Sequence, residues 1–210
     1  MIFLICRQRD EGLSLNMIEK KARDAFPRPV NTTYFDAIAQ RKNENARADS
    51  FFALCLLSSL CDRLGVDKAS LSLCRDESGR PFFKDSRLDF SISHSSGTVA
   101  VALSDLSCVG IDLELSPITQ KHANELAKRY FAPEEVKIVK EGLIGGENLG
   151  EIEAFRYIWT EKEAYTKMSG IPLSHVLSST DTQKGFVRHI SVGEITLALC
   201  SSGEDEIKII

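Results

Sequence analysis

Three carboxylates in two short motifs are the side chains most able to do chemistry. Asp112 and Glu114 stand two residues apart after an apolar run, so on a β-strand they share one face. Glu163 lies in a strongly helical stretch with Lys162 beside it and Lys167 four residues later. Converging carboxylates favour a hard divalent cation such as Mg²⁺. Two neighbouring lysines favour a phosphate-bearing ligand.

Both motifs also have a simpler reading. Lys162 and Glu163 interrupt an apolar stripe of core spacing, and charges on a buried face are costly unless they are paired or ligated. The alternative is an ion pair between Glu163 and Lys167 on a solvated helix face. For Asp112 and Glu114 the alternative is a strand that ends in a polar loop. Because the two motifs occur together, we favour the metal site.

A third motif, residues 90–95, carries Ser93 and His94 at the end of a predicted strand. These donors suit a phosphate group, although a capped turn is the alternative. The chain has a net charge of −4, which argues against non-specific nucleic-acid binding. An anionic ligand must therefore meet a local basic cluster. One candidate is Arg41 and Lys42 with Arg47, and another is Arg80.

Hydrophobic periodicity predicts an alternation of strands and helices. The expected helices are 34–41, 45–64, 120–130, one that opens at Pro133, and 151–169; the expected strands are 1–10, 70–74, 88–94, 98–104, 107–114, 185–191 and 194–200. The turn Ser95-Ser96-Gly97 predicts a hairpin. Residues 142–150 are expected to form a flexible loop, and residues 11–33 a polar segment with a helix only after it.

Both halves of the chain run long helix, glycine, hairpin. The segment 99–103 resembles 195–199, which points to an internal duplication. We therefore predict an α+β fold of two similar halves related by pseudo-twofold symmetry, residues 1–105 and 106–210, working as a monomer. A ligand site is expected at their junction.

Composition places the chain among ordinary globular proteins, with 43% hydrophobic and 27% charged residues in 210. The apolar start is too short for a signal peptide, and no run approaches the ~20 apolar residues of a membrane span. We expect a cytoplasmic protein with no membrane partner. Its six cysteines are scattered, without a C-x-x-C pair, and are expected to be free thiols.

Four motifs in order resemble the 4′-phosphopantetheinyl transferases of the surfactin-synthetase-activating type over residues 41–175. They are Gly79-Arg80-Pro81, Phe90-Ser91-Ile92-Ser93-His94-Ser95, Gly110-Ile111-Asp112-Leu113-Glu114 and Trp159-x-x-Lys162-Glu163-Ala164-x-x-Lys167. The resemblance implies an enzyme that moves the 4′-phosphopantetheine group of coenzyme A to a serine of an apo acyl, aryl or peptidyl carrier protein. Adenosine 3′,5′-bisphosphate would be released.

The resemblance also implies residue roles. Asp112, Glu114 and Glu163 would hold Mg²⁺, or Mn²⁺, on the pyrophosphate of coenzyme A, and Lys162 and Lys167 would flank that pyrophosphate. The nucleotide end would contact Lys42, Arg47, Arg80, Ser93 and His94. Glu163 is the candidate acceptor of the serine proton.

The sequence departs from the family pattern in two places. Gly170-Ile171-Pro172-Leu173 replaces a segment that often carries a lysine, and Ser91 stands where the family often has asparagine. Two rivals come from other classes: a catalytically impaired module that binds coenzyme A and carrier proteins, and a metal-dependent phosphohydrolase.

Overall fold

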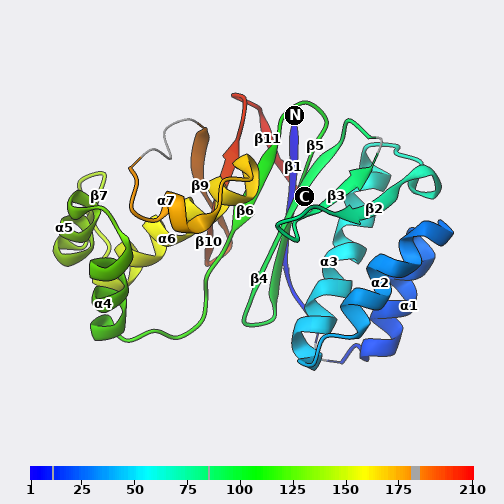
Figure 1. The fold of residues 1–210 in the computed structure, drawn as a ribbon, viewed down its shortest axis with the longest axis horizontal. Helices are drawn as coiled ribbons and strands as arrows, with labels where there is room; N and C mark the ends of the chain where they lie inside the picture. Colours follow the sequence, from blue (N-terminus) through cyan, green and yellow to red (C-terminus); the bar gives the residue numbers. More distant parts are fainter. Residues whose placement is uncertain (11, 85, 181–184) are drawn as a thin grey trace.

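The computed structural model describes residues 1–10, 12–84, 86–180 and 185–210. Strands run through the middle of the molecule, with helices α1–α3 on one side and α4–α7 on the other (Figure 1). The architecture is the mixed α+β type that the sequence predicts.

The first sheet has four strands in the order β11-β1-β5-β4. β1 (Ile2–Gln8) pairs antiparallel with β5 (Thr98–Ser104), and β5 pairs antiparallel with β4 (Asp89–Ser95). β11 (Ile207–Ile209) lies parallel to β1 on the opposite edge. The last strand of the chain thus completes the sheet that the first strand begins, while β4 remains an edge strand.

A two-residue turn closes the predicted β4–β5 hairpin. Ser96 and Gly97 both have positive φ, 50° and 77°. Positive φ at both central positions produces the twist that fits a tight hairpin, and glycine adopts it at little cost. All seven residues of β5 are buried, as expected of a strand with neighbours on both edges and layers on both faces.

Helices α1 (Leu15–Ala25), α2 (Thr32–Ala39) and α3 (Glu44–Arg63) pack beside this sheet, with the 3₁₀ turn η1 (Pro29–Asn31) between the first two. Asn43 caps α3 by accepting a hydrogen bond from the amide of Ala46 at 3.0 Å. The main apolar core lies between these helices and one face of the sheet. A small hairpin sits at its edge, formed after η2 (Lys68–Ser70) by β2 (Ser72–Arg75) and β3 (Pro81–Lys84).

The second sheet has three antiparallel strands in the order β6-β10-β9. They are β6 (Val109–Asp112), β10 (Ile195–Ser201) and β9 (Phe186–Val192). Helix α6 (Glu151–Ser169) packs across β6 and β10. A second core, formed by alternate residues of β1, β5, β6 and β10, joins the two sheets.

The remaining elements surround the first half of α6. They are α4 (Gln120–Tyr130), α5 (Pro133–Glu141), α7 (Leu173–Val176) and a two-rung hairpin of β7 (Leu143–Ile144) with β8 (Glu147–Asn148). Their shared core is built on stacked rings of Phe131, Phe155 and Trp159.

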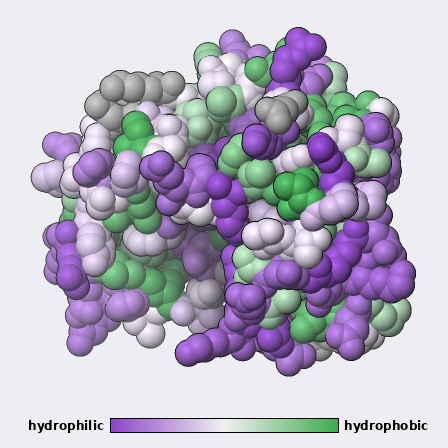
Figure 2. Space-filling view, turned by 45° about the vertical axis from the view of Figure 1, so that its right-hand side comes forward, coloured by the Kyte–Doolittle hydropathy of each residue, from purple (hydrophilic) through white to green (hydrophobic). Residues whose placement is uncertain are grey.

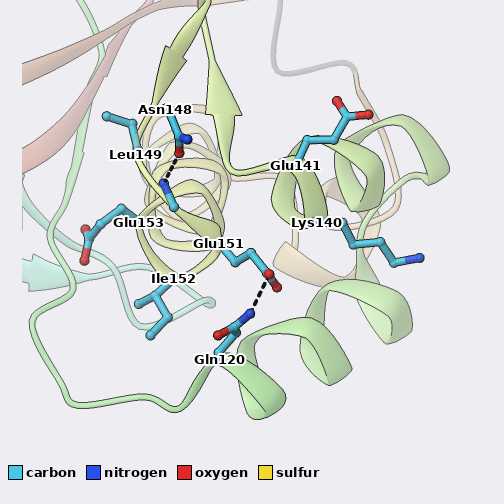
Figure 3. Close-up of a pocket in the computed structure, with 9 residues that line it drawn as sticks. Gln120, Lys140, Glu141, Asn148, Leu149, Glu151, Ile152 and Glu153 are labelled. Atoms are coloured by element: carbon cyan, nitrogen blue, oxygen red, sulfur yellow. Dashed lines mark hydrogen bonds between the residues drawn. The ribbon is translucent and has the colours of Figure 1, made fainter.

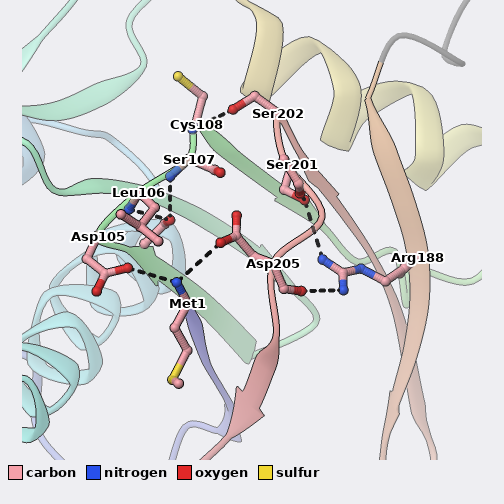
Figure 4. Close-up of polar contacts among 11 residues, drawn as sticks. Met1, Asp105, Leu106, Ser107, Cys108, Arg188, Ser201, Ser202 and Asp205 are labelled. Carbon is pink, nitrogen blue, oxygen red and sulfur yellow. Dashed lines mark hydrogen bonds and ion pairs between the residues drawn. The ribbon is translucent and has the colours of Figure 1, made fainter.

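Polar contacts fasten the β5–β6 connection to the β10–β11 connection (Figure 4). The amino group of Met1 lies 2.9 Å from an oxygen of Asp105 and 3.2 Å from one of Asp205. Arg188 donates to the carbonyl oxygen of Asp205 at 2.6 Å. These contacts link elements that the linear sequence keeps far apart.

Some elements differ from those predicted. The polar segment before Pro27 contains α1, which buries Ile18 and Ala22, four residues apart, on one face. The predicted loop 142–150 contains the β7–β8 hairpin, and α7 and β11 were not predicted. The helix predicted over 45–64 is α3, within one residue at each end.

The surface in Figure 2 is mostly hydrophilic, with hydrophobic side chains in small separate patches and a hollow between its two lobes. The six cysteines are free, as predicted. Among the described residues, no helix has both the length and the apolar character needed to cross a membrane.

Candidate active site

Gly110 allows α6 to lie directly on β6. A Cβ atom at Gly110 would come 1.9 Å from the carbonyl oxygen of Ala164 and 2.6 Å from the amide nitrogen of Met168, and both are backbone atoms. Only a residue without a side chain fits this crossing. The crossing places the end of α6 over Asp112, which ends β6.

Two of the predicted site residues, Asp112 and Lys167, form an ion pair at this crossing. The Lys167 Nζ donates to Asp112 Oδ1 at 2.7 Å and to the carbonyl oxygen of Ile111 at 3.0 Å. Ser93, on β4, donates its hydroxyl to the same carboxylate oxygen at 2.7 Å. Both hydrogen bonds that the described residues make to the Asp112 side chain therefore end on Oδ1. Asp112 is only 7% exposed, so these contacts are shielded from water.

Glu163 faces the same point from α6. Burial raises its pKa, the charge of Asp112 raises it further, and that of Glu114 adds to both, while Lys167 opposes them. Glu163 lies one helical turn before Lys167 on α6, so it shares the face of the helix that crosses β6. The structure thus brings Asp112, Glu114, Glu163 and Lys167 to one region.

Glu114 follows β6 and is held by serines. Ser95 donates to its Oε1 at 2.8 Å, and the amide of Ser116 donates to the same atom at 2.6 Å. Burial acts to raise the pKa of Glu114, but the hydrogen bonds from Ser116 and Ser95 and the charge of Arg156 outweigh it, and the pKa is lowered. Glu114 is therefore ionised at neutral pH.

The donor chemistry of this region suits a hard divalent cation, because it offers carboxylate oxygens that repel one another. Among the described residues, however, no group of three or more His, Cys, Asp and Glu side chains is closed up around one metal-sized point. The Lys167 ammonium lies on Asp112 instead. A divalent cation would share Asp112 with Lys167 or displace it.

A row of polar side chains on β4 reaches across to β6, and the sequence analysis did not anticipate it. Each accepts a hydrogen bond from a backbone amide exactly twenty positions later: Asp89 from Val109 at 2.7 Å, Ser91 from Ile111 at 3.0 Å, Ser93 from Leu113 at 3.3 Å and Ser95 from Leu115 at 2.9 Å. We call these four residues the β4 ladder. They join the edges of the two sheets through side chains. The signal in the sequence is a polar residue at every second position of an otherwise apolar strand.

A cavity of about 590 Å³ opens beside Lys167. Its walls are the Ser78–Pro81 turn on one side, and the end of α6 with residues 170–173 on the other. Arg80 lines it, but its Nη2 is engaged with Asp89, both of whose oxygens lie at 2.8 Å. Arg80 therefore anchors the β4 ladder as well as facing the cavity.

His94 lies on the other side of the acidic residues. Partial burial lowers its pKa; the charges of Lys167 and Arg41 also lower it, against the opposing effect of Asp49 and Asp112. His94 and Asp49 share the lining of a cavity of about 340 Å³.

The other predicted basic residues lie around the start of α3. Arg47 donates to the carbonyl oxygen of Arg41 at 3.2 Å, and its buried Nε has no partner among the described residues. Arg41 donates to Ser50 at 2.7 Å, and burial followed by the charge of Arg75 lowers its pKa. Lys42 is exposed. Arg41, a predicted member of this basic cluster, thus has a basic neighbour, Arg75, that the sequence analysis did not select.

The structure does not bring Lys162 to the acidic residues. Its side chain is 1% exposed, and its Nζ lies 2.8 Å from Glu135 Oε1 and 2.6 Å from the carbonyl oxygen of Ser179. Adjacent helix residues point about 100° apart, so Lys162 faces the core shared with α5, whereas Glu163 and Lys167 face β6. In the structure Lys162 therefore lies away from the acidic residues, whereas it was expected beside them at the pyrophosphate.

Another cavity, of about 420 Å³, lies where α6 begins (Figure 3). Glu151 there accepts hydrogen bonds from Gln120 and Asn124 of α4, and Asn148 accepts one from the amide of Gly150 at 3.1 Å. These contacts fix the first turn of α6 against α4. None of the predicted site residues lines this cavity.

The segment that contains these acidic residues resembles a known family. Residues 108–206 match the family model of the 4′-phosphopantetheinyl transferase superfamily. The matched segment holds Asp112, Glu114, Glu163 and Lys167. It is just under half of the chain.

Curated relatives carry the same description. The chain is 36% identical to the 4′-phosphopantetheinyl transferase HetI of Nostoc sp. over 120 residues, which are 55% of this chain and 48% of that protein. It is 31% identical to the 4′-phosphopantetheinyl transferase Sfp of Bacillus subtilis over 54% of this chain and 48% of the relative. It is 30% identical to the 4′-phosphopantetheinyl transferase AcpT of Escherichia coli O157:H7, over 60% of this chain and 63% of that relative. The chain thus spans about half the length of the curated relatives it matches.

Proposed function

We propose that this protein is an enzyme that transfers the 4′-phosphopantetheine group from coenzyme A to a serine hydroxyl of an apo carrier protein. The observation that carries the proposal is the meeting of Asp112, Glu163 and Lys167 where α6 crosses β6, inside the segment that matches the superfamily. An acidic cluster with a lysine on it suits a metal-assisted reaction at a phosphate ester.

Coenzyme A binds across the acidic region with its pyrophosphate next to Lys167. The cavity beside Lys167 has room for part of the ligand, with Arg80 in its wall. His94, Ser93, Lys42 and Arg47 serve the nucleotide end, since an acidic protein must meet a polyanion with local donors.

Asp112, Glu114 and Glu163 are the residues that would hold Mg²⁺, or Mn²⁺. When bound, the ion would neutralise pyrophosphate charge and polarise the phosphoryl oxygens. The fit rests on the donor set: three carboxylates, of which Glu163 has its pKa raised by burial and then by the charges of the other two. A cation shared among them relieves that repulsion.

In the transfer, the carrier serine oxygen attacks the phosphorus next to the pantetheine. The bond from that phosphorus to the bridging oxygen breaks, and this oxygen leaves on adenosine 3′,5′-bisphosphate. Glu163 is the proposed acceptor of the serine proton, directly or through a water molecule. Lys167 offsets the charge that develops on the leaving group.

The carrier is an acyl, aryl or peptidyl carrier protein, and the enzyme acts as a cytoplasmic monomer. We also retain the proposal of two related halves, residues 1–105 and 106–210, with pseudo-twofold symmetry. Superposing residues 47–104 on 151–200 tests the symmetry, and failure to superpose even loosely would refute it. The transferase proposal does not depend on that result, because it rests on the site.

One assay tests the function against its rivals. The protein is incubated with Mg²⁺ and coenzyme A, with and without an apo-carrier, and mass spectrometry follows the carrier while chromatography follows coenzyme A. A transferase modifies the carrier; a phosphohydrolase consumes coenzyme A alone; a binding module does neither. Asp112→Ala should abolish transfer and keep the fold, whereas Lys20→Gln on the exposed face of α1 should change nothing.

A further inference from the structure

The β4 ladder contains two kinds of residue. Ser91 only accepts a backbone hydrogen bond from β6, at 3.0 Å. Ser93 and Ser95 accept one and also donate to a carboxylate: Ser93 to Asp112 Oδ1 at 2.7 Å, and Ser95 to Glu114 Oε1 at 2.8 Å. The two serines that point at acidic residues are therefore chemically distinct from the third.

We propose that Ser93 and Ser95 are positioning residues that set the orientation of the Asp112 and Glu114 carboxylates for a divalent cation. The inference deepens the proposed function and rests on it. It assigns Ser95 a role, although only Ser93 and His94 of the motif over residues 90–95 were predicted as site residues, and it assigns Ser93 a role besides that of a phosphate contact.

The hydrogen-bond direction in each pair is fixed by the backbone. A serine hydroxyl has one proton and two acceptor sites. Because the amide of Leu113 points at the Ser93 oxygen and that of Leu115 at the Ser95 oxygen, each hydroxyl proton is free to point at the carboxylate. An amide that donates to a hydroxyl also strengthens that hydroxyl as a donor. Each serine is thus held by a backbone amide and in turn holds one carboxylate oxygen in place.

The arrangement leaves the carboxylates well placed for a ligand on their other oxygen. Ser93 and Lys167 both occupy Asp112 Oδ1, so Oδ2 faces away from these donors. Ser95 and the amide of Ser116 both occupy Glu114 Oε1. Hydrogen bonds of this kind behind a ligating carboxylate orient it toward a metal.

Water is poorly placed to replace either hydroxyl. Ser93 is 5% exposed and Ser95 is 8% exposed. They lie where the edges of two sheets meet, so the spacing of the strands, and not a mobile loop, sets their distance from the acids. Removing a hydroxyl therefore leaves its carboxylate with one fewer hydrogen bond: Asp112 keeps the bond from Lys167, and Glu114 keeps the bond from the amide of Ser116.

Ser91 provides a matched control for the test. Ser91→Ala removes one ladder contact to β6, as Ser93→Ala and Ser95→Ala do, but it removes no contact to a carboxylate. Each variant is prepared as the full chain. Thermal unfolding measures the structural loss, and titration calorimetry with Mn²⁺ in the presence of saturating coenzyme A measures metal affinity.

We expect the three variants to lower the melting temperature by similar amounts. Ser93→Ala and Ser95→Ala should each weaken Mn²⁺ binding by about 10- to 100-fold, whereas Ser91→Ala should stay close to the wild type. If Ser93→Ala and Ser95→Ala bind Mn²⁺ as tightly as Ser91→Ala, the positioning role is overturned. Transfer to an apo-carrier by the wild type is recorded separately. Mn²⁺ binding that depends on the two serines in a protein that modifies no carrier would uphold the positioning role and reject the transferase.

Discussion

Lys167 lies on Asp112: its Nζ is 2.7 Å from Oδ1, and only 26% of its side chain is exposed. The cation of α6 and the acid that ends β6 therefore form one unit. In the free protein Lys167 supplies the positive charge that Asp112 would otherwise take from a metal ion. Under the proposed function, a divalent cation would compete with Lys167 for the charge of Asp112.

This relationship predicts opposite effects of Lys167→Met on two ligands. Without coenzyme A, Mn²⁺ should bind the variant about tenfold more tightly, because a repelling positive charge has gone from beside Asp112. Coenzyme A itself should bind more weakly, because the pyrophosphate loses a charged donor. Calorimetric titration with each ligand measures both effects. Unchanged Mn²⁺ affinity would show that Lys167 does not oppose metal binding at the acidic residues.

Lys162 is predicted to act on stability and not on chemistry. Its Nζ, Glu135 and the ring of Phe131 form a buried unit between α6 and α5. Removing one member of a buried ion pair leaves the other uncompensated and costs about 3–5 kcal/mol. Lys162→Met should lower the free energy of unfolding by that order, and Lys162→Met with Glu135→Gln should cost less than the two single changes together.

Urea denaturation of the four proteins measures this coupling. Turnover of Lys162→Met is then assayed at a temperature where the variant is folded, and it should stay within about threefold of the wild type. A variant of normal stability that has lost transfer would instead place Lys162 at the reacting groups.

Local patterns gave the sequence analysis its correct elements. The helix of α3, the strands β4 and β5 and their tight turn follow from apolar periodicity and from Ser96-Gly97. Helix α1 was missed because its polar composition hides a narrow apolar face. β11 was missed because three residues become a strand only by pairing with β1, some two hundred positions earlier.

The site divides in the same way. Glu163 and Lys167 stand four residues apart, so a helix places them on one face. Asp112 lies on a strand with its side chain on one face of the sheet, so the sequence could predict that the three side chains meet. The contribution of Ser95 depends on two sheet edges meeting, which no local pattern encodes. Lys162 was misplaced because a motif gives neighbours in sequence, whereas a helix separates them in direction.

The surroundings of His94 predict that the affinity for coenzyme A depends on protonation of this ring. Its pKa in the free protein is lowered by partial burial and by the charges of Lys167 and Arg41, so the ring is neutral at pH 7. A phosphate dianion beside the ring raises its pKa, and the complex therefore binds a proton that the free protein lacks. Affinity should rise as the pH falls through the pKa of the complex.

Calorimetry in buffers of different ionisation enthalpy should detect this proton uptake with coenzyme A and far less of it with dephospho-coenzyme A. His94→Ala should weaken coenzyme A by about tenfold more than dephospho-coenzyme A, on the scale of one charge-assisted hydrogen bond. An equal loss for both ligands would mean that His94 only caps the hairpin.

His189 predicts a loss of stability in mild acid. Its ring stacks on Tyr157, with centroids 3.3 Å apart, and its Nε2 lies 3.2 Å from the Tyr157 carbonyl oxygen. Burial lowers its pKa from 6.5 to about 4, with that hydrogen bond opposing the shift. Between these values the unfolded chain binds a proton that the folded protein refuses. The contribution of His189 to stability is therefore complete above pH 6.5. It declines as the pH falls toward 4, by up to about 1.4 kcal/mol per pH unit before solvent screening reduces it.

His189→Gln should flatten this part of the curve of unfolding free energy against pH. His122→Gln, at an exposed position on α4, should keep the wild-type slope. Urea denaturation at half-unit steps from pH 4 to pH 7.5 makes the comparison, and parallel curves for wild type and His189→Gln would show that this histidine is protonated as readily in the folded protein as in the unfolded chain.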